Sequence, residues 1–581
     1  MRTTPKWLFP VLALLPVLGL YGCIRVYPII ETLRLSLFQW NIISRRKPFV
    51  GFANFVELAS DPLFLEAIFN TTIIAFSVVA ITIPVALALA ALINTRQGLR
   101  RSGVYEASVF LPHVVSLVPA AMAWKWIFDA RLGPLNALIG LVGIPAQSWL
   151  FDPVLSLVCL IVLCSWQAIG YAVLIFLVGL KNVPEALYEA ARLDGASSFQ
   201  AFRHIAVPLL KPVMLYVSVI TLISSYNIYA QAFVLASDVQ GAPGRLVRVL
   251  VLDMLENSFR NYRVGYGCRR SRRTARHRAH FDQRAVQAVP RQESRMSEHE
   301  REHPSVVGQN GAVGLVIDAV LGVVSLMMLL PLVFLISNAF KTPPELLAWP
   351  PTVIPHQPTL ENIVSVLRET PLFRWIGNSL IFATLSTASI VSTSAIAGYV
   401  LGKFDLPGIP VIFGVIIATA VVPFEVYMIP LYLNVQSAGL LNTWPGLLVG
   451  YLIMSFGIFL VRQYVMTSIP DELLEAARVD GAGELWIFLR IVLPLMRGPL
   501  GALAVLAFFQ AWTAFAWPLV VMTNKETYTL EVGLALFQTG FTVDIGRLSA
   551  AAALALVPSA LFFSLMRRNF VRGVASSGLK E

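Results

Sequence analysis

Two short polar segments interrupt the apolar runs of this chain, and both place an acid and a base where they could meet. They are "YEAARLDGASSFQAFRHIAVPLL", residues 188–210, and "LEAARVDGAGELWIFLRIVLPLM", residues 474–496. Residues three apart share one face of a helix. Glu189 and Arg192 can therefore pair within a helix or engage a partner protein.

The two segments are copies of one another. A single offset of 286 residues aligns Pro184 with Pro470 and Gly195 with Gly481 without a gap, and thirteen of the twenty-nine positions between 184 and 212 are identical. Chance similarity between apolar segments would not preserve charged residues and glycines in this way. We infer an internal duplication.

Each copy predicts a helix, a glycine turn and a second helix. Asn182 and Ser468 each stand three positions before an acid, a spacing typical of a capping box that starts a helix. Gly195 and Gly481 stand where such a helix should end. The second helices are expected over 197–206 and 483–492.

Elsewhere the reactive side chains form no catalytic pattern. The sequence contains no G-x-x-x-x-G-K-[ST] nucleotide loop, and its four cysteines lack the spacing of a metal site. No Ser/His/Asp or paired-carboxylate pattern is present either. We expect no enzyme activity, no metal and no cofactor, so any ATP must be hydrolysed by another chain.

Polar side chains deep in apolar stretches are candidates for a transport path. They form two groups related by the same offset, in which aromatic rings adjoin amide or hydroxyl groups, as suits the faces and edge of a sugar. These candidates are Tyr226, Asn227 and Gln231 in one group, Gln510, Trp512 and Thr513 in the other, and the separate carboxylate Glu425 between two prolines. Alternatively, such groups only bond one helix to another.

The composition is that of a helical membrane protein. Hydrophobic residues make up 57% of the 581 residues and charged residues 13%, against about 25% charged in soluble domains. Windows of about twenty apolar residues, enough to cross a bilayer, predict an all-α polytopic fold. The spans are expected near 8–30, 68–93, 104–128, 154–180 and 213–236, and near 312–339, 376–401, 409–432, 444–464, 500–524 and 546–569.

The repeated segments resemble the EAA loop of ABC importer permeases. Both carry Glu-Ala-Ala, three residues, Gly, nine residues and Ile-x-x-Pro, from Glu189 to Pro208 and from Glu475 to Pro494. This resemblance implies two type I permease domains, with five recognisable spans in the first and six in the second. It also implies that each loop is a cytoplasmic coupling helix seated in an ATPase subunit. The contact residues would be Glu189, Ala190, Ala191, Asp194 and Gly195, and Glu475, Ala476, Ala477, Asp480 and Gly481.

The Asp-Gly-Ala form of both loops is similar to the branch that imports oligosaccharides, polyols and glycerol-3-phosphate. In the second half "GLLNTWPGLLVGY", "YTLEVGL" and "NFVRGVASSGLKE" add to this resemblance, and the first half resembles the companion subunit. The implied protein is a permease of the bacterial inner membrane, surrounded by lipid. Its partners would be two ATPase subunits and an extracytoplasmic solute-binding protein.

The tract 268–295 does not fit a membrane domain. It contains nine arginines and accounts for most of the net charge of +11, so the charge gives no reason to expect nucleic-acid binding. Both coupling loops must face the cytoplasm, which requires a twelfth span here. A basic cytoplasmic linker would not supply it, whereas a reading-frame shift would turn alanine codons into arginine codons. We divide the chain into a first permease domain (1–267), an aberrant junction (268–311) and a second permease domain (312–581).

Two alternatives remain at this point. Iron and thiamine importers also include single-chain duplicated permeases, although the form of both loops favours the carbohydrate branch. An ion-driven secondary transporter is also built from repeats. It would have paired intramembrane carboxylates or broken helices at corresponding positions, and Glu425 has no counterpart in the first half.

Overall fold

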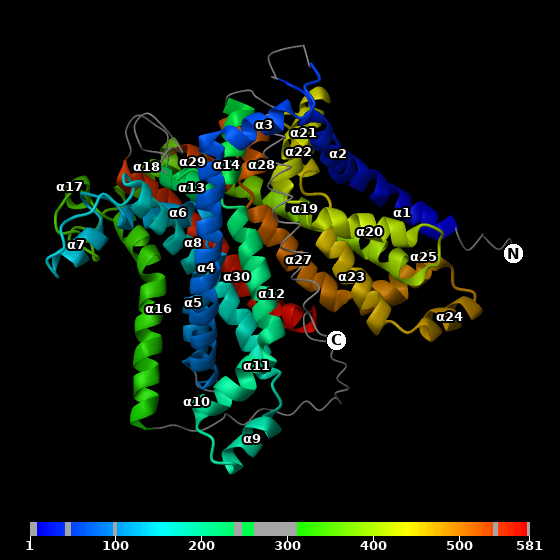
Figure 1. Cartoon of the computed structure of the whole chain (residues 1–581), viewed down its shortest axis with the longest axis horizontal. Helices are drawn as coiled ribbons and strands as arrows, with labels where there is room; N and C mark the ends of the chain where they lie inside the picture. The colour runs from blue at the N-terminus through cyan, green and yellow to red at the C-terminus, as the bar shows by residue number, and fades with distance from the viewer. Residues whose placement is uncertain are drawn as a thin grey trace.

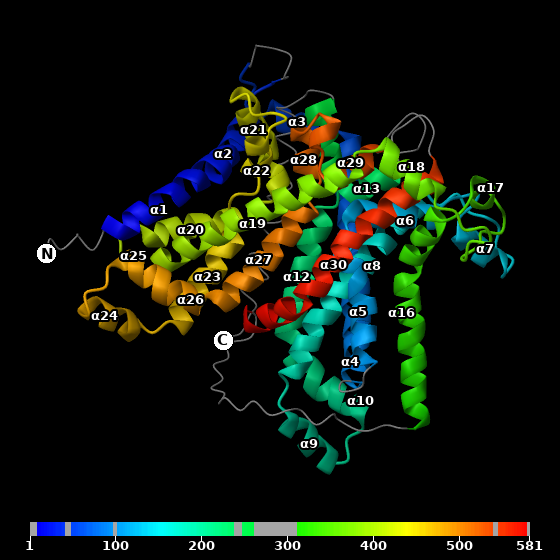
Figure 2. The same cartoon turned by 180° about the vertical axis from the view of Figure 1, so that it is seen from behind.

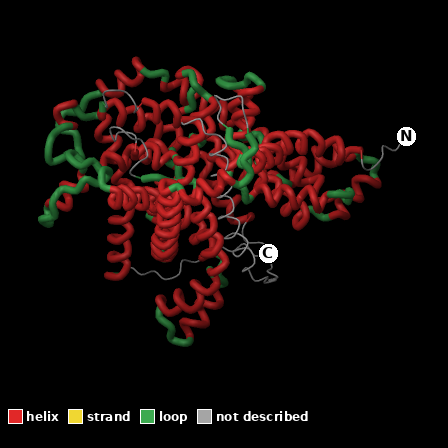
Figure 3. Tube along the Cα trace, turned by 45° about the horizontal axis from the view of Figure 1, so that its top comes forward, coloured by secondary structure: helices red, strands yellow, loops and turns green. Residues whose placement is uncertain are grey.

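The computed structural model describes residues 8–40, 48–96, 101–236, 247–260, 311–537 and 544–577 (Figure 1). Helices joined by loops make up these residues, and β contact among them is limited to an isolated bridge between Phe38 and Phe49 (Figure 3). The all-α expectation is confirmed. The arginine-rich tract 268–295 lies outside the described residues.

The helices fall into two halves. Those of the first half are α1 (Leu8–Tyr21), α2 (Tyr27–Leu35), α3 (Ala53–Ser60), α4 (Pro62–Asn94), α5 (Ser102–Val114), α6 (Leu117–Ile127), α7 (Pro134–Gly140), α8 (Pro153–Lys181), α9 (Glu185–Leu193), α10 (Ser198–Ala201), α11 (Val207–Leu209), α12 (Lys211–Tyr226), α13 (Ala230–Ala236) and α14 (Leu250–Leu255).

Those of the second half are α16 (Ala312–Ala339), α17 (Pro343–Leu346), α18 (Glu361–Glu369), α19 (Leu372–Lys403), α20 (Ile409–Ala420), α21 (Phe424–Ser437), α22 (Trp444–Val449), α23 (Ser455–Ser468), α24 (Asp471–Val479), α25 (Glu484–Ile487), α26 (Leu493–Leu495), α27 (Arg497–Trp512), α28 (Ala516–Val521), α29 (Leu530–Phe537) and α30 (Ile545–Ser577).

Nine of the eleven expected spans match segments that could cross a membrane. Five are single stretches of helix and four are helix pairs bent by more than 40°. The expectation of one span over 444–464 is wrong, because α22 ends at Val449 and α23 begins at Ser455. The indole of Trp517 enters this break and donates from Nε1 to the Leu447 carbonyl at 2.9 Å. The window 546–569 begins α30, whose apolar part runs from Ile545 to Leu561.

The third span of each half is broken at the corresponding place. Helices α5 and α6 meet at 99°, and α20 and α21 meet at 103°. Pro119 in the first turn of α6 and Pro423 just before α21 lack a backbone N–H, so a straight helix cannot continue through these points.

The first helix of each half packs on the other half. The hydroxyl of Tyr21 on α1 forms a hydrogen bond of 2.7 Å with the hydroxyl of Ser455 in the second half. Conversely, α16 packs along α5 and α6, and its Met328 carbonyl accepts from Trp166 Nε1 at 3.0 Å. An ion pair of 3.2 Å between Arg96 and Asp318 joins the same two halves. The halves therefore cannot separate without breaking buried contacts.

In each half, a hydroxyl on a long helix accepts a hydrogen bond from the first amide of a short helix. In the first half, the hydroxyl of Thr71 accepts from the Leu250 amide at 3.0 Å. In the second half, Ser379 accepts from the Leu530 amide at 2.8 Å. These bonds attach α14 to α4 and α29 to α19, so the duplication extends beyond the repeated loops.

The two halves meet at one end of the molecule and diverge toward the other (Figures 1 and 2). Helices α6, α13, α28 and α29 gather at the meeting end, which we call the junction end. The repeated segments α9 and α24 lie at the far ends of the two halves. The two repeated loops are thus far apart, whereas the halves are in contact at the junction end (Figure 1).

Close packing of α19 against α23 depends on Gly398. A Cβ at this position would lie 2.6 Å from Val461 Cγ1 and 2.9 Å from the Arg462 nitrogen. Gly377 lies on the same helix and has no atom within 4 Å of such a Cβ.

We therefore predict that Gly398→Ala destabilises the protein by about 1–3 kcal/mol through overpacking. Gly377→Ala is the matched control and should leave stability unchanged or slightly raised, since alanine favours helix. Thermal unfolding of the purified chain in detergent measures both. Equal midpoints for the two variants would contradict the close α19–α23 contact.

Candidate functional site

The repeated segments fold identically and remain at the surface. Helices α9 and α24, α10 and α25, and α12 and α27 begin at positions that differ by the same 286 residues. Glu189, Ala190, Asp194 and Gly195 are exposed, and Ala191 is partly buried. In the second copy the same pattern holds: Glu475, Ala476, Asp480 and Gly481 are exposed and Ala477 is partly buried.

A glycine ends each first helix, as expected. Gly195 has φ +78° and Gly481 has φ +82°, a left-handed conformation that costs other residues energy. The amides of Ala196 and Ala482 close the turn on carbonyls five residues back, at 2.9 and 3.0 Å. The expected capping by Asn182 and Ser468 is wrong. The N-cap residues are Pro184 and Pro470, which have no side-chain acceptor for the first amides.

The second helix of each copy runs on through a single π turn. Val207 and Leu493 donate to carbonyls five residues back, Phe202 and Phe488. The next residue in each case is a proline, which has no N–H and whose ring crowds the preceding turn. A π bulge therefore precedes the EAA-type proline in each loop. The chain then bends by 65° between α11 and α12 in the first half and by 76° between α26 and α27 in the second.

Each loop exposes an apolar side chain beside its glycine turn. Leu193 is 89% exposed and its counterpart Val479 is 86% exposed. Phe199 and its counterpart Leu485 are 68% and 59% exposed. Apolar side chains presented at the tips of polar loops are typical of a contact surface for another protein.

The two loops are braced differently. In the second copy, Lys403 at the end of α19 donates to the Ile469 carbonyl at 2.6 Å and pairs with Asp471 at 2.7 Å. Arg478 pairs with Glu484 at 2.7 Å, and this hydrogen bond raises the pKa of Arg478. The second loop is thereby bonded to the end of α19.

The first loop has a local brace instead. Ser197 and Gln200 form a capping box at the start of α10, in which the Ser197 amide donates to Gln200 Oε1 at 2.8 Å. Among the described residues, no side-chain hydrogen bond ties α9 to the long helices of its half. The second loop is therefore anchored to the rest of its half more firmly than the first loop.

The structure separates the residues proposed for a transport path. Gln231 on α13 donates to Gln167 on α8 at 3.1 Å. Tyr226 lies within hydrogen-bond distance of Thr72, at 3.3 Å, and Asn227 follows it at the break between α12 and α13. All three residues are partly buried.

Two of the corresponding residues in the second half have their polar groups bonded within that half. Trp512 is buried and its Nε1 donates to Ser559 at 3.1 Å. The hydroxyl of Thr513 donates to the Phe509 carbonyl at 2.9 Å. Gln510 is exposed on the same helix. In this conformation, Trp512 and Thr513 thus bond within their own half.

The breaks after α12 and α27 bring equivalent residues together. Tyr229 and Phe515 differ by 286 positions, and their ring centroids lie 5.4 Å apart across the two halves. Phe233 also lies 5.6 Å from Phe515. The approximate two-fold relation between the halves therefore passes close to this aromatic contact at the junction end.

A further cross-half contact was not expected from the sequence. His113 on α5 stacks on Phe509 of α27 at 5.6 Å and lies 5.2 Å from Tyr171. His113 follows Pro112 inside an apolar run. It could have been found by the criterion that selected Gln231, a polar side chain within an apolar stretch. Together with Gln167 it extends the candidate path along α5 and α8.

Glu425 occupies the start of a broken helix. It lies in the first turn of α21, where a carboxylate interacts favourably with the free amides. The expected opening at Pro423 is present, whereas α21 continues through Pro430. Glu425 is partly buried.

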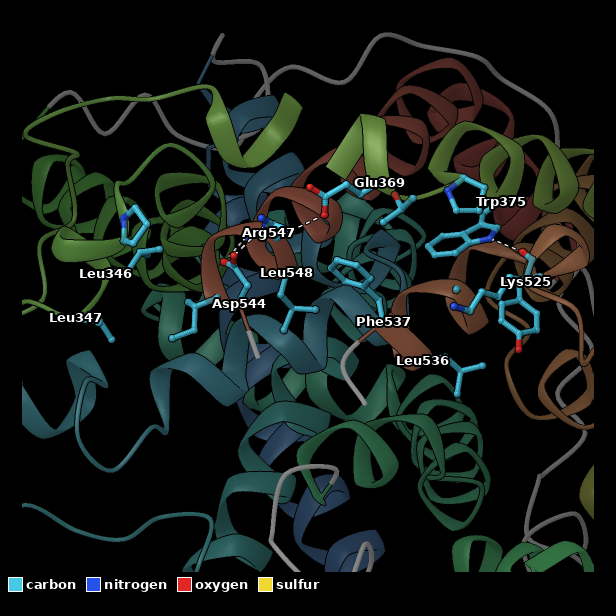
Figure 4. Close-up of a pocket in the computed structure, with 16 residues that line it drawn as sticks. Leu346, Leu347, Glu369, Trp375, Lys525, Leu536, Phe537, Asp544, Arg547 and Leu548 are labelled. Atoms are coloured by element: carbon cyan, nitrogen blue, oxygen red, sulfur yellow. Dashed lines mark hydrogen bonds and ion pairs between the residues drawn. The ribbon is translucent and has the colours of Figure 1, made fainter. Parts of the chain in front are cut away.

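A cavity of about 670 Å³ lies on the second half at the junction end (Figure 4). Trp375, Tyr528 and Phe537 contribute aromatic surface, while Arg547 pairs with Glu369 and with Asp544 inside its lining. None of the residues proposed for the path lines this cavity.

Comparison with known proteins identifies two family segments in the chain. The model of the family described as "Binding-protein-dependent transport system inner membrane component" matches residues 81–240 and 394–576, together more than half of the chain. Each segment contains one repeated loop. The duplication inferred from the sequence is thus reproduced.

Individual relatives are about half as long as this chain. It is 32% identical to the probable ABC transporter permease protein YurN of Bacillus subtilis, over 45% of this chain and 88% of that protein. It is 32% identical to the arabinooligosaccharides transport system permease protein AraQ of Halalkalibacterium halodurans, over 43% and 90%. It is 33% identical to the lactose transport system permease protein LacF of Rhizobium radiobacter, over 44% and 83%.

The anchoring of α24 by Lys403 gives a prediction. Lys403→Met removes the bonds to Ile469 and Asp471, so amide hydrogen exchange over 471–479 should become roughly five- to tenfold faster. Lys211→Met replaces an exposed lysine just after the first loop and should leave this rate unchanged. Unchanged exchange in both variants would show that Lys403 does not anchor the helix.

Proposed function

This chain belongs to the family of binding-protein-dependent transport system inner membrane components, and we propose that it supplies both halves of the permease of one ABC importer. As a permease it is the transport component of an inner-membrane system and not a catalytic subunit. The finer proposals concern its cargo, its ATPase contacts and its path.

The observation that carries the proposal is the twofold occurrence of one exposed loop. Both copies have the same helix lengths, the same left-handed glycine and the same π turn. A single exposed hairpin could be merely structural, but two in register fit a transporter in which each half binds one ATPase subunit.

In the proposed arrangement each loop binds one ATPase subunit in the cytoplasm. Glu189, Ala190, Ala191, Asp194 and Gly195 form one contact, with Leu193 supplying exposed apolar area. The corresponding contact is formed by Glu475, Ala476, Ala477, Asp480 and Gly481, with Val479. The junction end then faces outward, where a solute-binding protein delivers the cargo.

The cargo is proposed to be a sugar, oligosaccharide, polyol or glycerol-3-phosphate. Support comes from relatives named for arabinooligosaccharide and lactose transport, and from the Asp-Gly-Ala form of both loops. Iron or thiamine import receives no such support. An ion-driven carrier would also contain broken helices at corresponding positions, but it has no use for paired ATPase-binding loops.

The proposed path runs between the halves along α5, α8 and α13. Its polar groups are Gln167 and Gln231, and its aromatic walls are Tyr171 and Phe509 with His113 between them. Tyr226, Asn227 and Gln510 border it, whereas Trp512, Thr513 and Glu425 enter it after a rearrangement. Aromatic faces beside amides suit a ring with apolar faces and hydroxyl edges.

We also propose that the chain divides into permease domains 1–267 and 312–581, with 268–311 as a junction. The two parts share a common core of contacts: α4 packs on α8 and α12 in the first, and α19 packs on α23 and α27 in the second. The exchange of α1 and α16 between the parts explains why the two domains function as one body.

We predict that Glu189→Ala and Glu475→Ala, made separately, each weaken binding of the ATPase subunit by roughly 5- to 30-fold and reduce ATP-driven uptake. Removing a carboxylate from a buried protein contact has this effect even when the permease itself is intact. Co-purification with the ATPase and vesicle uptake measure the two effects. Glu66→Ala, an exposed glutamate on α4, is the control, and uptake that needs no ATPase would contradict the proposal.

The path gives a separate prediction. Gln231→Ala leaves the buried Gln167 without its partner and removes an amide from the path, so KM for sugar uptake should rise about two- to tenfold. Lactose and an arabinooligosaccharide serve as probe substrates. Ser389→Ala, whose hydroxyl bonds the Leu452 carbonyl within the second half, should leave KM unchanged. An unchanged KM for Gln231→Ala would exclude it from the path.

A further inference from the structure

Glu531 is a wholly buried carboxylate that bonds across the two halves. It lies on α29 of the second half with 0% of its surface exposed. Its Oε2 accepts from the Val118 amide of the first half at 2.9 Å. The Ser116 hydroxyl and the Leu117 amide face the same carboxylate, although Oε1 completes no hydrogen bond of good geometry in the described part of the chain.

The backbone of α6 needs this acceptor. The first amides of a helix have no acceptor within the helix, and α6 begins directly after the 99° bend, where Ser116 and Val118 are fully buried. Water cannot satisfy amides at such a place. The N-terminus of a helix also carries a partial positive charge, which favours a carboxylate.

The two halves differ in where the acid at the start of the helix after the bend comes from. Helix α21 follows the equivalent bend of the second half and has its own acid, Glu425, in its first turn. Helix α6 has no acid in its first turn. The acid that accepts from α6 comes from the opposite half. Glu531 therefore bonds the two halves of the chain to each other.

Other cross-half contacts surround Glu531. Ser116 of the first half and Ser559 of the second half approach to 3.3 Å. The aromatic contact between Tyr229 and Phe515 closes the same end. Each of these contacts joins one half to the other. They lie across the surface that must open if cargo is to enter from outside.

We propose that Glu531 is a positioning residue for transport, which holds the junction end closed by accepting the free amides of α6. The inference rests on the proposed function, because it needs the halves to open alternately at their two ends. When the junction end opens, the α6 amides lose their acceptor. Glu531 therefore sets part of the free-energy difference between the open and closed conformations.

Cross-linking across the junction end tests this. In a chain whose four native cysteines are replaced, Phe233→Cys and Phe515→Cys place thiols on opposite halves, and neither residue bonds to Glu531. A short bis-thiosulfonate reagent joins them, and cleavage at a protease site engineered into 268–311 separates joined from unjoined chains. No ATPase, binding protein or substrate is needed, so a failure here leaves the coupling-loop proposal untouched.

With Glu531→Ala the ratio of joined to unjoined chain should fall roughly fivefold or more, since buried amides lose their acceptor. Glu531→Gln keeps an acceptor oxygen of the same reach and should restore most of the yield. Glu361→Ala, an exposed glutamate of α18, is the control and should leave the yield unchanged. If the alanine variant does not fold, Glu531→Asp replaces it, because its shorter side chain cannot reach Val118.

A yield with Glu531→Ala or Glu531→Asp equal to that of the parent chain would overturn the proposal. So would a lowered thermal midpoint without a change in cross-linking, since Glu531 would then only stabilise the fold. Failure of Glu531→Gln to restore the yield would overturn the assignment of the hydrogen bond as the closing interaction.

Discussion

A hydrocarbon layer offers no hydrogen bonds, so every backbone group released at a helix break must find a partner inside the protein. This constraint accounts for several of the polar side chains near the helix breaks. Trp517 binds the carbonyl released between α22 and α23. Ser379 and Glu531 bind amides at the starts of α29 and α6. These breaks are therefore supported from neighbouring helices, and at α6 the support comes from the other half.

The duplication preserved the loop geometry but not its bracing. Both coupling segments keep the glycine turn and the π bulge, since these depend on a local glycine and a local proline. The bonds that hold them depend on distant residues, which have diverged. Lys403 anchors the second segment to α19, while the first has only its capping box. The two loops therefore share one backbone geometry and differ in how firmly they are held.

The shape of the molecule connects the loops with the junction end. Helices α9 and α24 lie at the ends of two diverging groups of helices, which meet around Tyr229 and Phe515 (Figure 1). Bringing the loops together would turn each group about the region where they meet. Because packed interfaces change between discrete arrangements, the buried bonds at the junction end have to break in this motion. The exchange of α1 and α16 also holds the two halves together.

The sequence by itself determined the helical class, the duplication and the loop geometry. These follow from apolar length, from charged residues repeated at one offset, and from Gly195 and Gly481, all of which act locally. It also indicated Gln231 and Trp512 as polar groups within spans, without showing what they contact. Only the tertiary structure decided that Trp512 bonds to Ser559, that one apolar window is split around Trp517, and that a lone acid in "YTLEVGL" reaches α6. Such bonds join residues far apart in the chain, and no local pattern encodes the partner of a buried polar group.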